Sequence, residues 1–264
     1  MMVGDVPKRP TIVFLHFFGG SARSWDSVLD ELGEGFRTLP LDLPGFGAAA
    51  GASGPFTIAA YADRVEEVAF AQKLDHYVLV GHSMGGKVAL ALAARRPPAL
   101  RALVLLAPSP PTPEPIGEEM RAKLIAGWGS YGPASETLAR VTRRCLEGGL
   151  RERTISDMMN ASKGAWTAWL QHGSREDISA AMQMIDVPVT ILSGDGDAAV
   201  PRNLIKREVV ARLPHARLIS VPGAGHLLPL EAPEVVAAII EKSLREPALA
   251  SQEPEQREIA MTAA

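Results

Sequence analysis

Short, continuously apolar runs alternate along this chain with segments in which apolar residues recur at every third or fourth position. Each run is shorter than a typical helix, so the runs indicate buried strands, whereas the periodic segments indicate helices. The predicted strands are residues 11–15, 36–42, 77–80, 102–107, 187–192 and 216–221. The predicted helices between them are residues 24–32, 57–69, 87–94, 204–213 and 234–244. Apolar strands that alternate with helices predict an α/β fold with a mostly parallel, doubly wound sheet.

The alternation of strands and helices stops in the middle of the chain. Five prolines between Pro108 and Pro115 stiffen the exit from a predicted strand. Residues 118–172 then show helical periodicity alone, although strands should recur every few tens of residues in an α/β domain. We therefore expect a helical cap at residues 111–174, inserted into a core formed by residues 1–110 and 175–245. Residues 246–264 are polar and aperiodic, which predicts a flexible C-terminal tail.

One junction between a predicted strand and a predicted helix carries a reactive side chain. Gly81-His82-Ser83-Met84-Gly85 fits the pattern G-x-S-x-G. A chain that changes from strand to helix in so few residues bends sharply, and glycines remove the Cβ atoms that would collide there. The serine hydroxyl is thereby presented above the sheet edge, at the positive end of the new helix. A flexible turn is the alternative interpretation, but the flanking strand and helix favour a nucleophile.

Further polar side chains follow the last two predicted strands. Asp195 and Asp197 come after the first of these strands, and His226 comes after the second. Parallel strands place their sites at one edge of the sheet, so these groups are expected near Ser83. A serine hydroxyl is a poor nucleophile unless an imidazole takes its proton and a carboxylate holds that imidazole. The residues themselves leave either aspartate open as the acid.

Five segments together resemble the α/β-hydrolase superfamily, and within it the serine carboxylesterase-like branch with a helical cap. They are residues 16–20, 42–47, 81–86, 194–201 and 223–226, the last with Glu231 and Pro233. The resemblance extends over about residues 11–244 and implies the α/β-hydrolase fold. It implies that Ser83 is the nucleophile, Asp197 the acid and His226 the base. Asp197 is preferred to Asp195 because the usual spacing in the family is G-x-x-D.

The resemblance also implies an oxyanion hole, which is formed by backbone N–H groups rather than by side chains. The expected donors are the amides of Phe18 and Met84. Phe17 stands where the superfamily commonly has glycine, so two phenyl rings are expected to crowd the pocket mouth. Phe17 could equally belong to the core. His16 corresponds to a structural residue of the family and is expected to brace the loop.

Several apolar or aromatic residues are candidates for contact with a substrate. They are Phe17, His82, Trp128, Met158, Trp166, Trp169 and Leu227. For those in the predicted cap, packing within the cap is the simpler alternative. His82 is also expected to pack beneath the turn that carries the serine. No arginine or lysine can be placed in the pocket from the sequence, so the residues indicate a small, largely apolar substrate rather than a charged one.

Composition excludes several other classes of function. The formal net charge is −3 over 264 residues, which gives no basic surface for nucleic acid. No uninterrupted apolar run approaches the ~18 residues of a membrane span, and no signal peptide is recognised at the start, so a cytoplasmic protein is expected. Cys145 is the single cysteine and is expected to be buried. The six histidines include no H-x-x-x-H pair, so a catalytic metal is not expected. No cofactor is expected either.

The sequence therefore predicts a carboxylesterase that works through an acyl-enzyme. A lactonase or a carbon–carbon bond hydrolase acting on vinylogous diketones could use the same three residues, although the latter family often has asparagine at the position of His82. A perhydrolase side activity is compatible with this chemistry. A serine at residue 83, rather than an aspartate, argues against haloalkane dehalogenases and epoxide hydrolases. A receptor that retains the triad is the non-enzymatic alternative. The sequence leaves the oligomeric state open.

Overall fold

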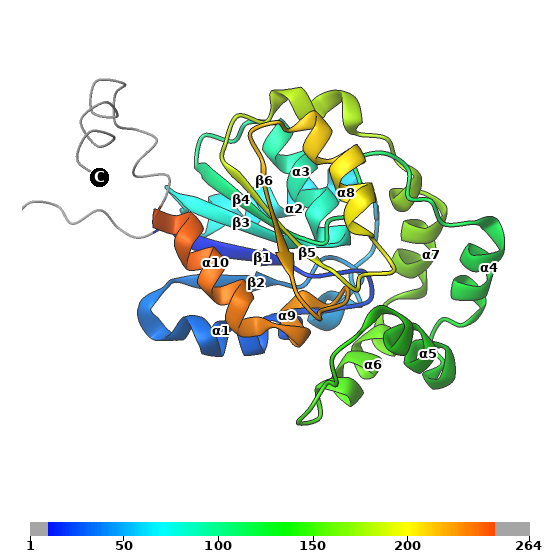
Figure 1. Ribbon diagram of the computed structural model, residues 1–264. Helices are drawn as coiled ribbons and strands as arrows, with labels where there is room; N and C mark the ends of the chain where they lie inside the picture. Colours follow the sequence, from blue (N-terminus) through cyan, green and yellow to red (C-terminus); the bar gives the residue numbers. More distant parts are fainter. Residues whose placement is uncertain (1–9, 246–264) are drawn as a thin grey trace, which may run out of the picture.

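A single parallel sheet forms the centre of the molecule (Figure 1). The structure is a computed structural model that describes residues 10–245. The strands are β1 (Thr11–Leu15), β2 (Thr38–Leu41), β3 (Tyr77–His82), β4 (Leu100–Leu106), β5 (Val189–Gly194) and β6 (Arg217–Val221). Their order in the sheet is β2-β1-β3-β4-β5-β6, and every neighbouring pair is parallel. The predicted α/β fold with a mostly parallel sheet is confirmed.

Helices cover both faces of this sheet. One face carries α1 (Asp26–Leu32), α9 (Leu228–Glu231) and α10 (Pro233–Arg245), and the other carries α2 (Ile58–Ala71), α3 (Met84–Ala94) and α8 (Arg202–Glu208) (Figure 1). Alternate residues of β1 belong to two different hydrophobic clusters, Val13 and Leu15 to one and Ile12 and Phe14 to the other. Side chains alternate between the faces of a strand, so continuously apolar strands contribute to two cores. Each face of the sheet thus packs against its own layer of helices, which is the doubly wound arrangement.

Four longer helices lie between β4 and β5 and are called the cap helices below. They are α4 (Glu118–Ala126), α5 (Tyr131–Val141), α6 (Leu150–Asn160) and α7 (Lys163–Gln171). Helix α4 packs on α7 and α5 packs on α6, so the four form two pairs. Figure 1 shows both pairs outside the layers of the core, at one end of the sheet.

Some details differ from the expectations. The helix expected at residues 204–213 begins at Arg202, and after Glu208 it gives way to a short 3-10 turn (Val210–Arg212). Cys145 was expected to be buried and is exposed, because it lies in the loop between α5 and α6, away from both cores. The predicted tail at residues 246–264 lies outside the described residues. Among residues 10–245, no helix has the length and apolar character needed to cross a membrane.

Candidate active site

The link between β3 and α3 is a single strained residue, Ser83. Its φ of 51° and ψ of −112° place it in a region that side-chain-bearing residues rarely adopt. A Cβ atom on Gly81 would lie 2.5 Å from the carbonyl oxygen of Gly85, and one on Gly85 would lie 2.5 Å from that of Leu15. Strand, turn and helix can approach this closely only because both glycines lack a side chain. The strained turn holds the serine hydroxyl at the carboxyl end of β3.

Hydrogen bonds connect Ser83, His226 and Asp197 in a row. The Ser83 Oγ lies 2.9 Å from His226 Nε2, and His226 Nδ1 donates to Asp197 Oδ2 at 2.8 Å. The other carboxylate oxygen of Asp197 accepts the amide N–H groups of Ala199 and Val200 at 2.8 and 2.9 Å. All three side chains belong to buried residues. The structure thus brings together the three residues that the sequence had placed at different strand ends.

Asp195, the other candidate for the acid, lies outside this row. It is exposed, and its Oδ1 accepts the backbone N–H of Gly223 at 2.8 Å. That bond connects the turn after β5 to the turn after β6. The geometry therefore gives Asp195 a contact within the loops and gives Asp197 the contact with the imidazole.

The charge state of His226 depends on two opposing effects. Burial lowers the pKa of its imidazole, but the charge of Asp197 and the hydrogen bond from Nδ1 raise it, and the net result is a raised pKa. The carboxylates of Glu114 and Glu231 act in the same direction as Asp197. In contrast, burial holds the pKa of the adjacent His82 well below its ordinary value. Of these two neighbouring imidazoles, only His226 is poised to gain a proton.

The loop that carries His226 is fixed from several sides. Glu231 is buried, and its carboxylate accepts four backbone N–H groups, from Arg143, Arg144 and Gly225 on Oε2 and from Leu227 on Oε1. The His226 amide donates to the carbonyl of Val141 at 2.8 Å, and His82 Nε2 donates to the His226 carbonyl at 2.8 Å. The end of α5 and the segment that follows it are therefore bonded directly to the residues around the imidazole.

The loop after β1 contains Phe18, one predicted oxyanion donor, and the other, Met84, begins α3 directly after the serine. Within residues 10–245, neither the Phe18 amide nor the Met84 amide donates a hydrogen bond to another group. His16 is fully buried, donating from Nδ1 to the Phe17 carbonyl at 2.7 Å and accepting the Leu43 amide on Nε2 at 3.1 Å. Burial lowers the pKa of His16. This neutral imidazole braces the loop that carries Phe18.

A cavity of about 410 Å³ opens above Ser83 and His226. Five of the predicted substrate contacts line it, namely Phe17, Met158, Trp166, Trp169 and Leu227, and so does Phe18. The ring of Phe18 lies 4.3 Å from that of Trp166 and 6.1 Å from that of Trp169, measured between centroids. The cap helices thus contribute an aromatic wall to the cavity.

Two of the predicted substrate contacts do not reach this cavity. His82 is fully buried beneath the imidazole of His226, with ring centroids 5.3 Å apart. Trp128 lines a second cavity of about 150 Å³ among the cap helices. Its indole N–H donates to the carbonyl of Ala161 at 2.8 Å, which fixes the ring there.

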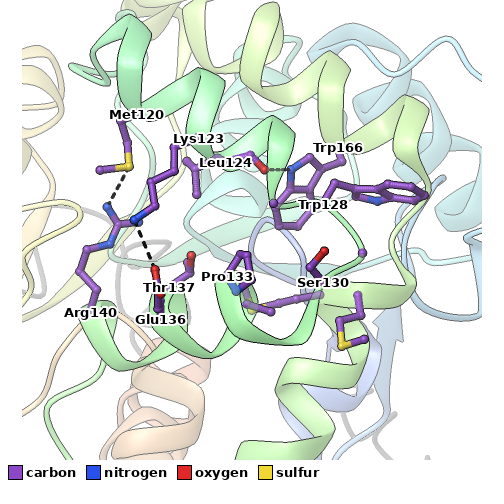
Figure 2. Close-up of a pocket in the computed structure, with 15 residues that line it drawn as sticks. Met120, Lys123, Leu124, Trp128, Ser130, Pro133, Glu136, Thr137, Arg140 and Trp166 are labelled. Carbon is purple, nitrogen blue, oxygen red and sulfur yellow. Dashed lines mark hydrogen bonds and ion pairs between the residues drawn. The ribbon is translucent and has the colours of Figure 1, made fainter.

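The second cavity, whose lining is drawn in Figure 2, shares part of its wall with the first. Trp166 and Leu124 line both, and the Trp166 indole N–H donates to the Leu124 carbonyl at 3.0 Å. Helices α4 and α5 are bridged beside it by two side-chain contacts, Lys123 with Glu136 at 3.3 Å and Arg140 with Met120 at 3.4 Å. Trp166 therefore belongs to the partition between the two spaces.

Two charged residues that the sequence did not place in the pocket also line the larger cavity. They are Glu114, on the connection between β4 and α4, and Arg140 on α5. Glu114 lies in a proline-rich, irregular segment, so no periodicity indicates where its side chain points. Arg140 is largely exposed and lies on the side shared with the second cavity. Across the described part of the chain, no group of three or more His, Cys, Asp or Glu side chains could hold a metal ion.

Comparisons with known proteins agree with this fold. The Alpha/beta hydrolase family matches residues 12–239. A pimeloyl-[acyl-carrier protein] methyl ester esterase from Aromatoleum aromaticum is 33% identical, over 90% of this chain and 99% of that protein. A putative 2-succinyl-6-hydroxy-2,4-cyclohexadiene-1-carboxylate synthase from Bacillus subtilis is 29% identical, over 88% and 89% of the two chains. A thermophilic esterase of known structure from Thermogutta terrifontis is 28% identical, with a TM-score of 0.76 over 90% of each chain.

The chain belongs to the alpha/beta hydrolase family. The match covers the sheet, the cap helices and all the segments that carry Ser83, Asp197 and His226. Esterases among its relatives support hydrolase activity.

Proposed function

We propose that this protein hydrolyses carboxylic esters of small, largely apolar substrates through an acyl-enzyme. The observation that carries the proposal is the hydrogen-bonded row from Ser83 through His226 to Asp197, which opens into a cavity with aromatic walls. Hydroxyl, imidazole and carboxylate in this order are the groups that nucleophilic acyl transfer requires. The relative from Aromatoleum aromaticum is named as a methyl ester esterase, which supports the ester as the bond attacked.

The first half of the reaction forms the acyl-enzyme. The Ser83 Oγ attacks the ester carbonyl carbon while His226 Nε2 accepts the hydroxyl proton. Asp197 holds Nδ1 of the same imidazole and stabilises the positive charge that develops on it. The tetrahedral oxyanion is bound by the amides of Phe18 and Met84, and His226 then protonates the departing alkoxide.

The second half repeats these steps with water. The alcohol leaves, water takes its place, and His226 Nε2 removes a proton as the water oxygen attacks the acyl carbon. The oxyanion again lies against the two backbone amides. Collapse of this intermediate returns the proton from His226 to Ser83 and releases the acid. One molecule of ester and one of water thus give one acid and one alcohol.

A substrate panel tests the proposed function directly. We expect short p-nitrophenyl esters to be hydrolysed with normal saturation kinetics, because the apolar cavity accepts their acyl and aryl groups. The panel should grade the acyl and alcohol lengths and should include lactones and a vinylogous diketone. Turnover of esters at least tenfold above lactones and the diketone supports the proposal. A preference for either of the other two classes, or ligand binding with no turnover of any of them, contradicts it.

The activity should depend on pH through His226. The imidazole must be neutral to accept the proton of Ser83, and its pKa is raised above the ordinary 6.5. We therefore expect kcat/KM to be low in acid and to rise with pH, with a midpoint above 6.5, as His226 loses its proton. A stopped-flow or steady-state pH profile for a neutral ester measures this midpoint. A flat profile between about pH 5 and 8 would contradict the role of His226.

A further inference from the structure

The catalytic cavity contains a carboxylate that the proposed mechanism does not use. Glu114 lines the cavity together with Ser83 and His226, and it is half-buried. Its backbone is fixed, because its N–H donates to the Ser174 carbonyl at 2.7 Å and its carbonyl accepts from Arg121 at 3.2 Å. These bonds fix the position from which the Glu114 side chain extends.

The Glu114 carboxylate forms no ion pair with any residue of the described chain. Two nearby cations bond to other groups than this carboxylate: Lys87 Nζ donates to the carbonyls of Thr112 and Glu176, and Arg121 donates mainly to backbone carbonyls, that of Glu114 included. Burial raises the pKa of Glu114, against the lowering effects of the neighbouring Ser109 hydroxyl and of the positive charges nearby. A half-buried carboxylate without an ion-pair partner gains free energy from a cation that enters the cavity.

Aromatic rings line the same cavity as Glu114. Trp169 packs against Gly173, the neighbour of Ser174, which is the residue bonded to the Glu114 backbone. Phe18 and Trp166 continue this wall with ring contacts to one another. Aromatic faces attract cations through their quadrupoles, and a quaternary ammonium group loses little hydration on entering such a site. A carboxylate and several aromatic rings that line one cavity are together suited to an ammonium group.

We propose that Glu114 and the aromatic wall form a subsite for a positively charged amine or quaternary ammonium group on the ester substrate. The proposal rests on the esterase function given above and specifies its substrate class. Arg140 provides the opposing charge in the cavity, but it is exposed, so solvent screens its charge more than that of the half-buried Glu114. The wall around Glu114 should therefore favour a cation and disfavour a carboxylate.

The test compares substrates that have the same shape but differ in charge. Choline esters are compared with the esters in which a carbon atom replaces the nitrogen, so that only the charge changes. A second pair carries the trimethylammonium or tert-butyl group at the end of the acyl chain of a p-nitrophenyl ester. In at least one pair, wild type should show a kcat/KM about tenfold higher for the cationic member, mainly through a lower KM.

Glu114→Gln keeps the size of the side chain and removes its charge. We expect this variant to lose about tenfold more kcat/KM on the cationic ester than on its neutral isostere, which brings the ratio close to one. Glu119→Gln, at an exposed position on α4, is the matched control and should leave the ratio unchanged. A ratio unaffected by Glu114→Gln, or a preference for a carboxylate-bearing ester that Arg140→Gln abolishes, would overturn the proposal.

A binding measurement separates this proposal from the proposed function. Titration of choline into Ser83→Ala, followed by calorimetry, needs no turnover. Affinity should fall about tenfold when Glu114→Gln is added to Ser83→Ala, and the neutral carbon analogue of choline should bind weakly to both. Equal binding of choline to the two variants would overturn the subsite even if neutral esters are hydrolysed. Conversely, selective choline binding without any ester turnover would retain the subsite and refute the esterase.

Discussion

Replacing Ser83 by alanine should reduce kcat for a short p-nitrophenyl ester by roughly four to six orders of magnitude. The substitution removes the oxygen that bonds to the acyl carbon and leaves His226 with no hydroxyl to activate. The fold should survive, because alanine is smaller and the Ser83 side chain caps no helix amide. The remaining rate would come from the oxyanion amides and from substrate binding alone.

Mass spectrometry provides a second measurement of the same step. Wild type mixed with a slowly hydrolysed ester should gain the mass of one acyl group on the peptide that contains Ser83, and Ser83→Ala should gain none. Ser53→Ala, in an exposed loop, is the control and should behave as wild type. Full turnover by Ser83→Ala, or acylation at another residue, would refute the mechanism.

Replacing Glu231 by glutamine should lower both stability and activity, although the two side chains have the same shape. Both carboxylate oxygens of Glu231 accept backbone N–H groups, so the amide NH₂ of glutamine would face at least one of them. Leaving these buried donors without an acceptor costs about 2–4 kcal/mol of unfolding free energy. Thermal denaturation should show a Tm lower by roughly 6–12 °C.

The activity of Glu231→Gln should fall as well, by about ten- to a hundredfold in kcat. His226 lies between Gly225 and Leu227, whose amides both bond to Glu231, so a shift of this loop displaces the imidazole. Glu234→Gln is the matched control, since Glu234 is exposed and makes only a 3.6 Å ion pair with Arg144. That variant should remain within about 0.5 kcal/mol of wild type. A Glu231→Gln protein with an unchanged Tm would show that the four hydrogen bonds contribute little.

The sheet was predictable because its central strands are buried on both faces. Runs such as residues 77–80 are continuously apolar, and that pattern alone distinguishes them from the amphipathic helices. The turn at Ser83 was predictable because the chain can bend there only with glycine at residues 81 and 85. Both features depend on residues that are close together in the chain, so the sequence alone was sufficient to predict them.

The rest of the site depends on distances between residues far apart in the chain. Asp195 and Asp197 differ by two positions, and only the resemblance to a known family favoured the residue that contacts His226. Trp128 and Trp166 have the same apolar character, yet only the packing of the cap helices shows that Trp166 lines the catalytic cavity. Glu114 lies in a segment without regular structure, so no periodic pattern in the sequence shows where its side chain points.

Hydrogen bonds connect the end of α5 to the loop that carries His226. These bonds limit how the cap helices can be replaced by those of another protein. Val141, Arg143 and Arg144 are bonded to the backbone of His226 or to the side chain of Glu231. A chimera that receives the cap helices of another family member must therefore also receive that member's residues between α5 and α6, or retain the original ones intact. Grafts that cut between residues 141 and 144 should fold poorly or place the catalytic base incorrectly, whereas grafts that keep this stretch whole can alter substrate choice without disturbing proton transfer.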